Sequence, residues 1–196
     1  MDYAVLTGDI VGSSDLPPAL IETGLAALEC VAEAVPEAVW ISRHRGDGWQ
    51  MACEAALLDL RLALLVRASL RAVDPMLDTR IAMARGAGVI PENGDLNAAQ
   101  GAGFVASGRL LDAITGAELH HAAGGAWSAA VRLADALSKS WTQKQAETLR
   151  EMLALPAPSQ QATAEALGKS RQAVAQALQG AGFGPISEAL AQWEAA

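Results

Sequence analysis

The chain has 196 residues, a length that suits one ordinary domain or one domain with a small appendage. About half of the residues (52%) are apolar, so a sizeable core is possible and disorder is disfavoured. No apolar run reaches the thickness of a bilayer, because Arg61, Arg67 and Arg71 interrupt the longest one, and the N-terminus lacks the basic region of a signal peptide. These features predict a soluble cytoplasmic protein without membrane contact.

The net charge of −8 is unevenly distributed along the chain. Residues 1–138 contain nine Lys/Arg and seventeen Asp/Glu, whereas residues 139–196 contain five of each. An acidic body repels phosphate backbones, which argues against broad nucleic-acid affinity in that part. The only two cysteines, Cys30 and Cys53, lie in apolar surroundings, and we expect buried free thiols, with a disulfide as the alternative.

Hydrophobic periodicity and turn residues predict alternating strands and helices in the acidic body. Strands are predicted at 3–10, 38–44, 49–53, 79–84 and 118–122, and helices at 17–34, 54–73 and 104–114. A Gly-rich irregular stretch is expected up to residue 103. The order β-α-β-β-α-β is typical of a ferredoxin-like α+β sandwich, in which helices pack on one face of an antiparallel sheet.

Two short motifs each place one aspartate at the end of an apolar, β-prone run. They are Thr7-Gly8-Asp9-Ile10-Val11-Gly12-Ser13-Ser14 and Arg45-Gly46-Asp47-Gly48-Trp49. The first and third strands of the predicted topology are antiparallel neighbours, so we expect Asp9 and Asp47 to meet at one sheet edge. Two carboxylates suit Mg²⁺, which shares oxygen ligands with phosphates. Taken singly, Asp9 also suits a strand end and Asp47 an Asp-Gly hairpin turn.

The neutral tail is predicted to be entirely helical. An amphipathic helix at 127–138 connects it to the body, and Thr142 with Gln145 forms a capping-box pattern that opens a helix to about residue 153. Ser159 and Ser170 are predicted N-caps of two short helices whose connection at 167–170 matches helix-turn-helix spacing. The predicted organisation is therefore a body at 1–126, a connecting helix at 127–140 and a helix-turn-helix domain at 141–196.

The second of these short helices has residue types that suit DNA contact. They are Ser170, Arg171, Gln172 and Gln176 at or near its N-terminal half, with Lys169 just before it to neutralise a phosphate backbone. The alternative is a helical scaffold for dimerisation or for contact with the body, which the zero net charge of the tail favours.

Both aspartate motifs resemble known metal motifs. The first is similar to the first metal motif of class III nucleotide cyclases and the second to their second metal motif; residues 79–86 and 101–110 resemble the strand and helix that follow in that family. The resemblance spans roughly residues 3–122. The SatD family of small bacterial proteins is similar in overall plan, including a Gly-x-x-Phe segment at 101–104 and a C-terminal helix-turn-helix that opens with Trp141, Thr142 and Gln145.

The cyclase resemblance implies specific roles for residues of this chain. Asp9 and Asp47 would be the metal ligands, Arg109 would stabilise transition-state charge and Arg43 would select the base. The surrounding nucleotide or phosphate contacts would come from Gly8, Ile10, Gly12, Ser13, Gly46 and Gly48. The resemblance also implies a homodimer with Mg²⁺ as cofactor. For Arg109, a solvated position on an amphipathic helix is the alternative.

Two positions depart from the cyclase pattern. The catalytic asparagine is replaced by Val105, and the second base-reading residue falls at about Ala98. Valine cannot hydrogen-bond a ribose or a phosphate, so one oriented contact is missing. We therefore predict a cytoplasmic regulator in which a nucleotide- and Mg²⁺-binding domain is coupled to a DNA-binding helix-turn-helix. The alternatives are an active class III-like cyclase or nucleotidyltransferase, and a degenerate protein-interaction module.

Overall fold

The computed structural model describes residues 1–44 and 46–196, so Arg45 of the second motif lies outside the described residues. The strands are β1 (Asp2–Ile10), β2 (Val39–Arg43), β3 (Gly48–Cys53), β4 (Thr79–Val89), β5 (Gln100–Gly101) and β6 (Leu119–His121). The α-helices are α1 (Pro18–Glu29), α2 (Asp59–Val73), α3 (Ala102–Leu111), α4 (Gly125–Lys139), α5 (Gln143–Met152), α6 (Gln160–Ala166), α7 (Arg171–Gly180) and α8 (Phe183–Glu194). Short 3-10 helices lie at Ser13–Asp15, Cys30–Glu33, Ala56–Leu58 and Leu96–Ala98.

The strands form a mixed sheet whose central order is β2-β3-β1-β4. These four strands pair antiparallel, β5 extends the far end of β4, and β6 pairs parallel with β4. The first and third strands are therefore neighbours, as the predicted topology requires. This arrangement confirms the predicted fold class, an α+β protein with a ferredoxin-like antiparallel sheet followed by an all-α part.

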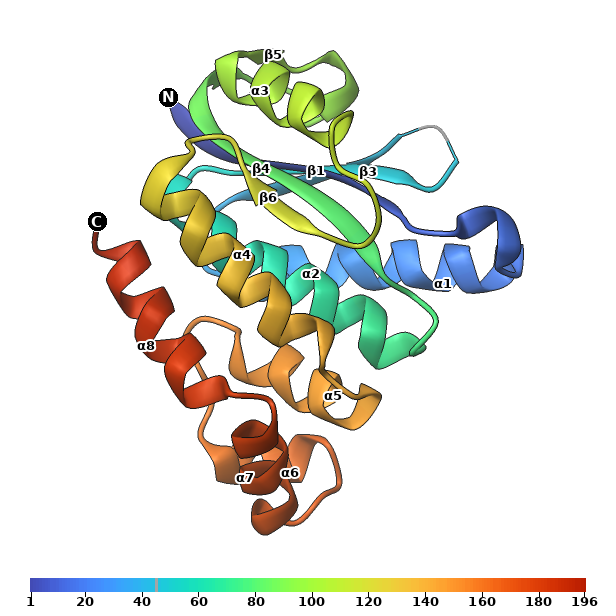
Figure 1. Cartoon of the computed structure of the whole chain (residues 1–196), viewed down its shortest axis with the longest axis vertical. Coiled ribbons are helices and arrows are strands. Elements are labelled where there is room, and N and C mark those ends of the chain that lie inside the picture. Colours follow the sequence, from blue (N-terminus) through green and yellow to red (C-terminus); the bar gives the residue numbers. More distant parts are fainter. Residues whose placement is uncertain (45) are drawn as a thin grey trace.

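The alternation of side chains along β1 assigns each residue to one face of the sheet. Leu6 and Ile10 join the apolar core beneath α1 and α2, whereas Tyr3 and Val5 join a smaller cluster on the opposite face. Helix α3 packs across β1 and β4 on this second face (Figure 1). Helices therefore cover both faces, not one as predicted, and Asp9 shares the α3 side with Val5.

Strand β4 continues past Ala84, where the sequence predicted its end, to Val89. We expected an irregular stretch there because of its glycines. The glycines instead allow α3 to approach the strand closely, because a Cβ on Gly88 would lie 2.7 Å from the ring of Phe104 on α3. The extended strand lets α3 lie directly on the backbone of the sheet.

Helix α2 is buried along most of its length because it lies between the sheet and the C-terminal helices (Figure 1). Its three arginines bond to other parts of the protein instead of facing water. Arg61 pairs with Glu194, and Arg67 with Asp135. Arg71 donates to two backbone carbonyls at the start of the C-terminal part. The charges that interrupt the apolar run therefore attach the tail to the body.

The C-terminal helices begin at the predicted caps. Thr142 and Gln145 form the capping box of α5, and the hydroxyls of Ser159 and Ser170 cap α6 and α7. One apolar core contains residues of the body, such as Leu65, and of the tail, such as Leu149. The division into a body, a connecting helix and a separate tail domain stays a prediction.

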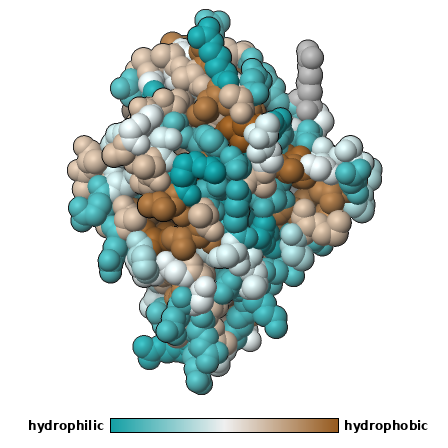
Figure 2. All heavy atoms as spheres, in the orientation of Figure 1, coloured by the Kyte–Doolittle hydropathy of each residue, from teal (hydrophilic) through white to brown (hydrophobic). Residues whose placement is uncertain are grey.

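An apolar groove lies between α4 and α8. Leu133 and Leu137, one turn apart on α4, are 70% and 44% exposed. Together with Pro185 and Ala189 of α8 they line a cavity of about 170 Å³, where Figure 2 shows a patch of apolar atoms. Apolar patches of this kind typically mark interaction surfaces. The homodimer expected from the sequence stays a prediction.

Both cysteines are free in the described structure. Cys53 is buried, and burial raises the pKa of its thiol to about 11. Cys30 is exposed, so the prediction that both thiols are buried is wrong for this residue. It begins a 3-10 helix in which the neighbouring Val31 is the buried residue. In the described part of the chain, no helix is long and apolar enough to cross a membrane.

Candidate functional site

Asp9 and Asp47 lie at the same end of the sheet. Asp9 is the penultimate residue of β1 and is paired in register with Gly48, the first residue of β3. Asp47 directly precedes Gly48. Both aspartates line one cavity of about 400 Å³, together with residues 10–12, Arg80 and Gly116. The topology therefore brings the two predicted metal ligands to one hollow, as the order of strands implied.

The carboxylate of Asp9 is held by Arg80, its register partner on β4. Arg80 Nε donates to Oδ1 of Asp9 at 2.7 Å, and Nη2 donates to Oδ2 at 2.7 Å. The remaining Nη1 donates to the carbonyl of Ile114 at 2.6 Å. The hydrogen bond with Asp9 raises the pKa of Arg80, against the effect of burial, and the charges of Asp47 and Asp112 add to the rise. Arg80 was not among the residues that we predicted from the sequence.

The loop after β1 presents backbone donors beside this cavity. Gly12 adopts the left-handed region (φ 68°), and a 3-10 turn starts at Ser13. The N–H groups from Gly12 to Ser14 have no backbone acceptor within the described residues. Ser13, Gly46 and Asp47 also line an adjoining hollow of about 310 Å³. Backbone N–H groups in such a turn form a concavity that suits an anion.

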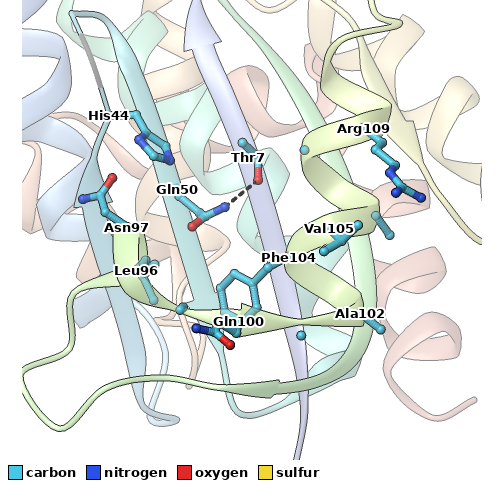
Figure 3. Close-up of a pocket in the computed structure, with 14 residues that line it drawn as sticks. Thr7, His44, Gln50, Leu96, Asn97, Gln100, Ala102, Phe104, Val105 and Arg109 are labelled. Carbon is cyan, nitrogen blue, oxygen red and sulfur yellow. Dashed lines mark hydrogen bonds between the residues drawn. The ribbon is translucent and has the colours of Figure 1, made fainter.

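A larger cavity, of about 900 Å³, lies between the sheet and α3 (Figure 3). Its polar lining residues are Thr7, His44, Gln50, Asn97, Gln100 and Arg109, and Leu96, Phe104 and Val105 are among its apolar ones. Gln50 Nε2 donates to Thr7 Oγ1 at 3.1 Å, and Thr7 Oγ1 is 2.9 Å from Ser107 Oγ. Arg109 is exposed on α3, across the cavity from His44 and Asn97 (Figure 3).

Thr7, Gln50 and Asn97 were not predicted from the sequence as site residues. Thr7 and Gln50 are polar residues on the face of otherwise apolar strands that the two-residue period assigns to the side of Asp9. That signal was present in the sequence. Asn97 follows no such pattern, because it lies in a 3-10 turn whose position depends on hydrogen bonds to Ser42 and Arg43.

Several predicted nucleotide contacts lie elsewhere or have structural roles. The guanidinium of Arg43 pairs with Glu22 at 2.7 Å and Glu29 at 3.1 Å on α1, and Arg43 lines none of the cavities described above. Gly8 packs against the indole of Trp49, where a Cβ would lie 2.4 Å from the ring. Gly48 contributes backbone pairing beside Asp9. The roles predicted for Ile10, Gly12, Ser13 and Gly46 stay predictions.

The predicted DNA-contacting residues divide into two groups. Lys169 pairs with Glu147 at 2.6 Å, and Ser170 caps α7 through the N–H of Ala173. Arg171, Gln172 and Gln176 are exposed on α7. Only this second group is available to a partner without breaking an intramolecular contact.

The two aspartates fit a divalent cation in ligand type, and two carboxylates suffice for Mg²⁺ when water and phosphate supply its other ligands. No third His, Cys, Asp or Glu joins them in a metal-binding group among the described residues. Both oxygens of Asp9 already accept bonds from Arg80. His120 and His121 do not combine either, because His121 is buried against Asp59 and His120 pairs with Glu118.

No family model matches the chain, and neither does any curated protein. Among solved structures, similarity is found to the guanylyl cyclase Cya2, with 19% identity, a TM-score of 0.46, and coverage of 64% of this chain and 79% of that chain. The adenylyl cyclase CyaB from P. aeruginosa gives 14% identity, a TM-score of 0.42 and coverage of 61% and 76%. A bacterial light-regulated adenylyl cyclase gives 14% identity, a TM-score of 0.45, and coverage of 78% of this chain and 58% of that chain. Membership of the SatD family stays a prediction.

Proposed function

We propose that this chain binds a phosphorylated ligand, most simply a nucleotide with Mg²⁺, at the cavity shared by Asp9, Asp47 and Arg80. The observation that carries this proposal is that two carboxylates and one arginine line one hollow, which also reaches Gly12, and that Ser13 and Ser14 line the hollow next to it. An arginine fork and backbone N–H groups are strong phosphate donors. The carboxylates supply the oxygen ligands that Mg²⁺ uses when it binds with a phosphate.

The larger cavity is suited to the remainder of such a ligand. Thr7 and Asp9 are two residues apart on the same face of β1, a separation of about 7 Å along the strand. A ligand whose phosphate lies near Asp9 can therefore place a polar ring near Thr7 and Gln50. Asn97 and Arg109 also line that cavity, although the guanidinium of Arg109 points away from Thr7 and Gln50 (Figure 3).

The composition of this cavity supports binding more than turnover. Val105, where the cyclase resemblance expects an asparagine, is 50% exposed and lines the cavity. It presents methyl groups where an oriented donor is needed for catalysis. We therefore propose a sensor of the ligand, with cyclisation or nucleotidyl transfer as the alternative that the binding experiment also examines.

We further propose that α6 and α7 form a DNA-binding helix-turn-helix that responds to the ligand. The exposed Arg171, Gln172 and Gln176 at the N-terminal half of α7 support this role, because Arg and Gln are the side chains that contact base edges and phosphates in a major groove. The short connection at 167–170 and the caps at Ser159 and Ser170 support this proposal, because they place two short helices in close succession.

Replacing Asp47 with asparagine is expected to weaken binding of ATP or GTP in the presence of Mg²⁺ by about tenfold or more, because one cation ligand loses its charge. Calorimetric titration of the full chain with each nucleotide, with and without Mg²⁺, measures this. Glu92→Gln is the matched control, since Glu92 is exposed and lines neither cavity. Unchanged affinity and Mg²⁺ dependence in Asp47→Asn would contradict the proposal. If the wild type releases a cyclic product and Asp47→Asn does not, the chain is an enzyme and not only a sensor of the ligand.

Replacing Arg171 with alanine is expected to weaken binding to all duplexes and to reduce the slope of log affinity against log salt by about one unit. The measurement is selection from a pool of random duplexes with the full chain, followed by titration of the selected duplex at several salt concentrations. Arg150→Ala on α5 removes the same charge away from α7 and should have no such effect. Absence of any duplex binding at low salt would reject a DNA role.

A further inference from the structure

We propose that Arg80 is a resident counter-ion which a divalent cation must displace from Asp9, so that Arg80 makes the site selective for a cation that arrives with phosphate. This inference rests on the proposed function and concerns how the same site is regulated. It starts from an observation that the aspartate motifs do not contain: within the described residues, the guanidinium of Arg80 bonds directly to the carboxylate of Asp9.

Both carboxylate oxygens of Asp9 accept hydrogen bonds from Arg80. Arg80 uses Nε and Nη2 on the two oxygens of the carboxylate, and Nη1 bonds to the carbonyl of Ile114 on the opposite side. The guanidinium is therefore fixed at both ends. A metal ion approaching Asp9 meets a carboxylate whose two oxygens both accept charge-assisted hydrogen bonds.

The charge of Arg80 reduces the attraction that the two carboxylates at this edge exert on a bare cation. The positive charge of Arg80 lies against the carboxylate that a metal would use, and like charges at such separations repel even where water screens them. The two side chains are 32% and 22% exposed, so the screening is partial. Asp47, which lines the same cavity, is then the only carboxylate of the pair free of this arginine fork.

A phosphate changes this balance because it offers Arg80 a new partner. The planar fork of arginine bonds phosphate oxygens as readily as a carboxylate. When Arg80 bonds to phosphate, Asp9 becomes available for a cation. Cation and phosphate should therefore strengthen each other's binding by the same factor, since coupling between two ligands is reciprocal.

The test is a titration of the full chain with Mn²⁺, in which electron paramagnetic resonance counts the free ion. Arg80→Gln is expected to bind Mn²⁺ about tenfold more tightly than the wild type in the absence of phosphate. Tripolyphosphate binds Mn²⁺ itself, so the same titration without protein is subtracted; after this subtraction, tripolyphosphate should increase the Mn²⁺ affinity of the wild type and increase that of Arg80→Gln much less. Arg150→Gln, which removes an exposed ion-paired arginine elsewhere, should match the wild type.

Arg80→Lys keeps the charge without the fork and provides a second variant if Arg80→Gln does not fold. It should retain the weak Mn²⁺ affinity of the wild type and lose part of the coupling to tripolyphosphate. Equal Mn²⁺ affinity in the wild type and Arg80→Gln, with nucleotide binding that still depends on Asp47, would overturn this inference alone. If neither protein binds Mn²⁺ or nucleotide, the proposed function and this inference both fail.

Discussion

Replacing Asp59 with asparagine is expected to lower the free energy of unfolding by about 3–5 kcal/mol, because it breaks a buried charge network. Asp59 is fully buried in the first turn of α2. Its carboxylate accepts from Nε and Nη2 of Arg85 at 2.8 and 2.9 Å, from Trp193 Nε1 at 2.7 Å, and from His121 Nε2, 2.8 Å away. An amide in its place leaves Arg85 without its counter-ion and presents a donor to other donors.

The tautomer of His121 follows from its second hydrogen bond. The N–H of Ala123 donates to Nδ1 at 3.0 Å, so Nε2 carries the proton and donates to Asp59. Arg85 in turn lies over the rings of Trp127 and Trp193, at 4.1 and 5.0 Å from their centroids. This cluster joins α8 to the sheet, and the loss of Asp59 should therefore loosen α8 first.

The stability contributed by Asp59 should also depend on pH. Burial raises the pKa of Asp59, but hydrogen bonds from His121, Arg85 and Trp193 outweigh it, so the net pKa is lowered. A carboxyl whose pKa is lower in the folded state stabilises the fold above its unfolded value, about 4, and loses that contribution as the pH falls through the folded pKa. The wild type should therefore lose more stability in acid than Asp59→Asn.

Urea denaturation of both proteins at pH 7 and pH 3 measures these effects. Asp2→Asn is the control, because Asp2 is exposed at the start of β1. If Asp59→Asn changes the free energy of unfolding at pH 7 by less than about 1 kcal/mol, the network contributes little net stability, as is the case for some buried ion pairs.

Local signals in the sequence were sufficient to predict much of this fold. The caps at Thr142, Ser159 and Ser170 are set by residues within three positions of each helix start, so they were readable without a structure. The order of strands followed from the alternation of elements. That order brings the end of β1 to the start of β3, and therefore brings Asp9 near Asp47.

The partner of Asp9 could not be predicted in the same way. Arg80 faces Asp9 only because β1 and β4 pair in one particular register. A shift by one residue would turn Arg80 to the other face of the sheet, and the hydrophobic pattern of residues 79–84 does not fix such a shift. The buried arginines of α2 were unpredictable for a similar reason. Their partners Glu194 and Asp135 lie far along the chain, and periodicity identifies only the apolar side of a helix.

Arg67 links the candidate site to the C-terminal helices. It is fully buried, and its Nη1 donates to Oδ1 of Asp135 and to Oγ of Ser138 on α4, both at 2.7 Å. Its Nε lies 3.4 Å from Asp78, whose carbonyl accepts from the N–H of Val11 in the loop after Asp9. One side chain thus contacts both α4 and the segment that supports the site loop.

Replacing Arg67 with methionine is expected to lower the free energy of unfolding by about 3 kcal/mol or more, because Asp135 remains buried without its closest charge. Arg132 and Lys139 also contact Asp135, at 3.0 and 3.2 Å, which places the effect at the lower end of the range for broken buried pairs. Chemical denaturation gives the loss. Amide hydrogen exchange should rise both in the last turn of α4 and at Val11 if Arg67 connects them.

Changing both Arg67 and Asp135 separates the net stability that the ion pair contributes from the cost of leaving one buried charge without a partner. Arg67→Met combined with Asp135→Leu replaces two buried charges by apolar groups, and it should recover part of the stability that Arg67→Met alone loses. If the double variant recovers stability but exchange at Val11 stays fast, the charge at Arg67 is what ties the site loop to α4. If exchange at Val11 is unchanged in every variant, movement at the site would have no route to the C-terminal helices through this arginine.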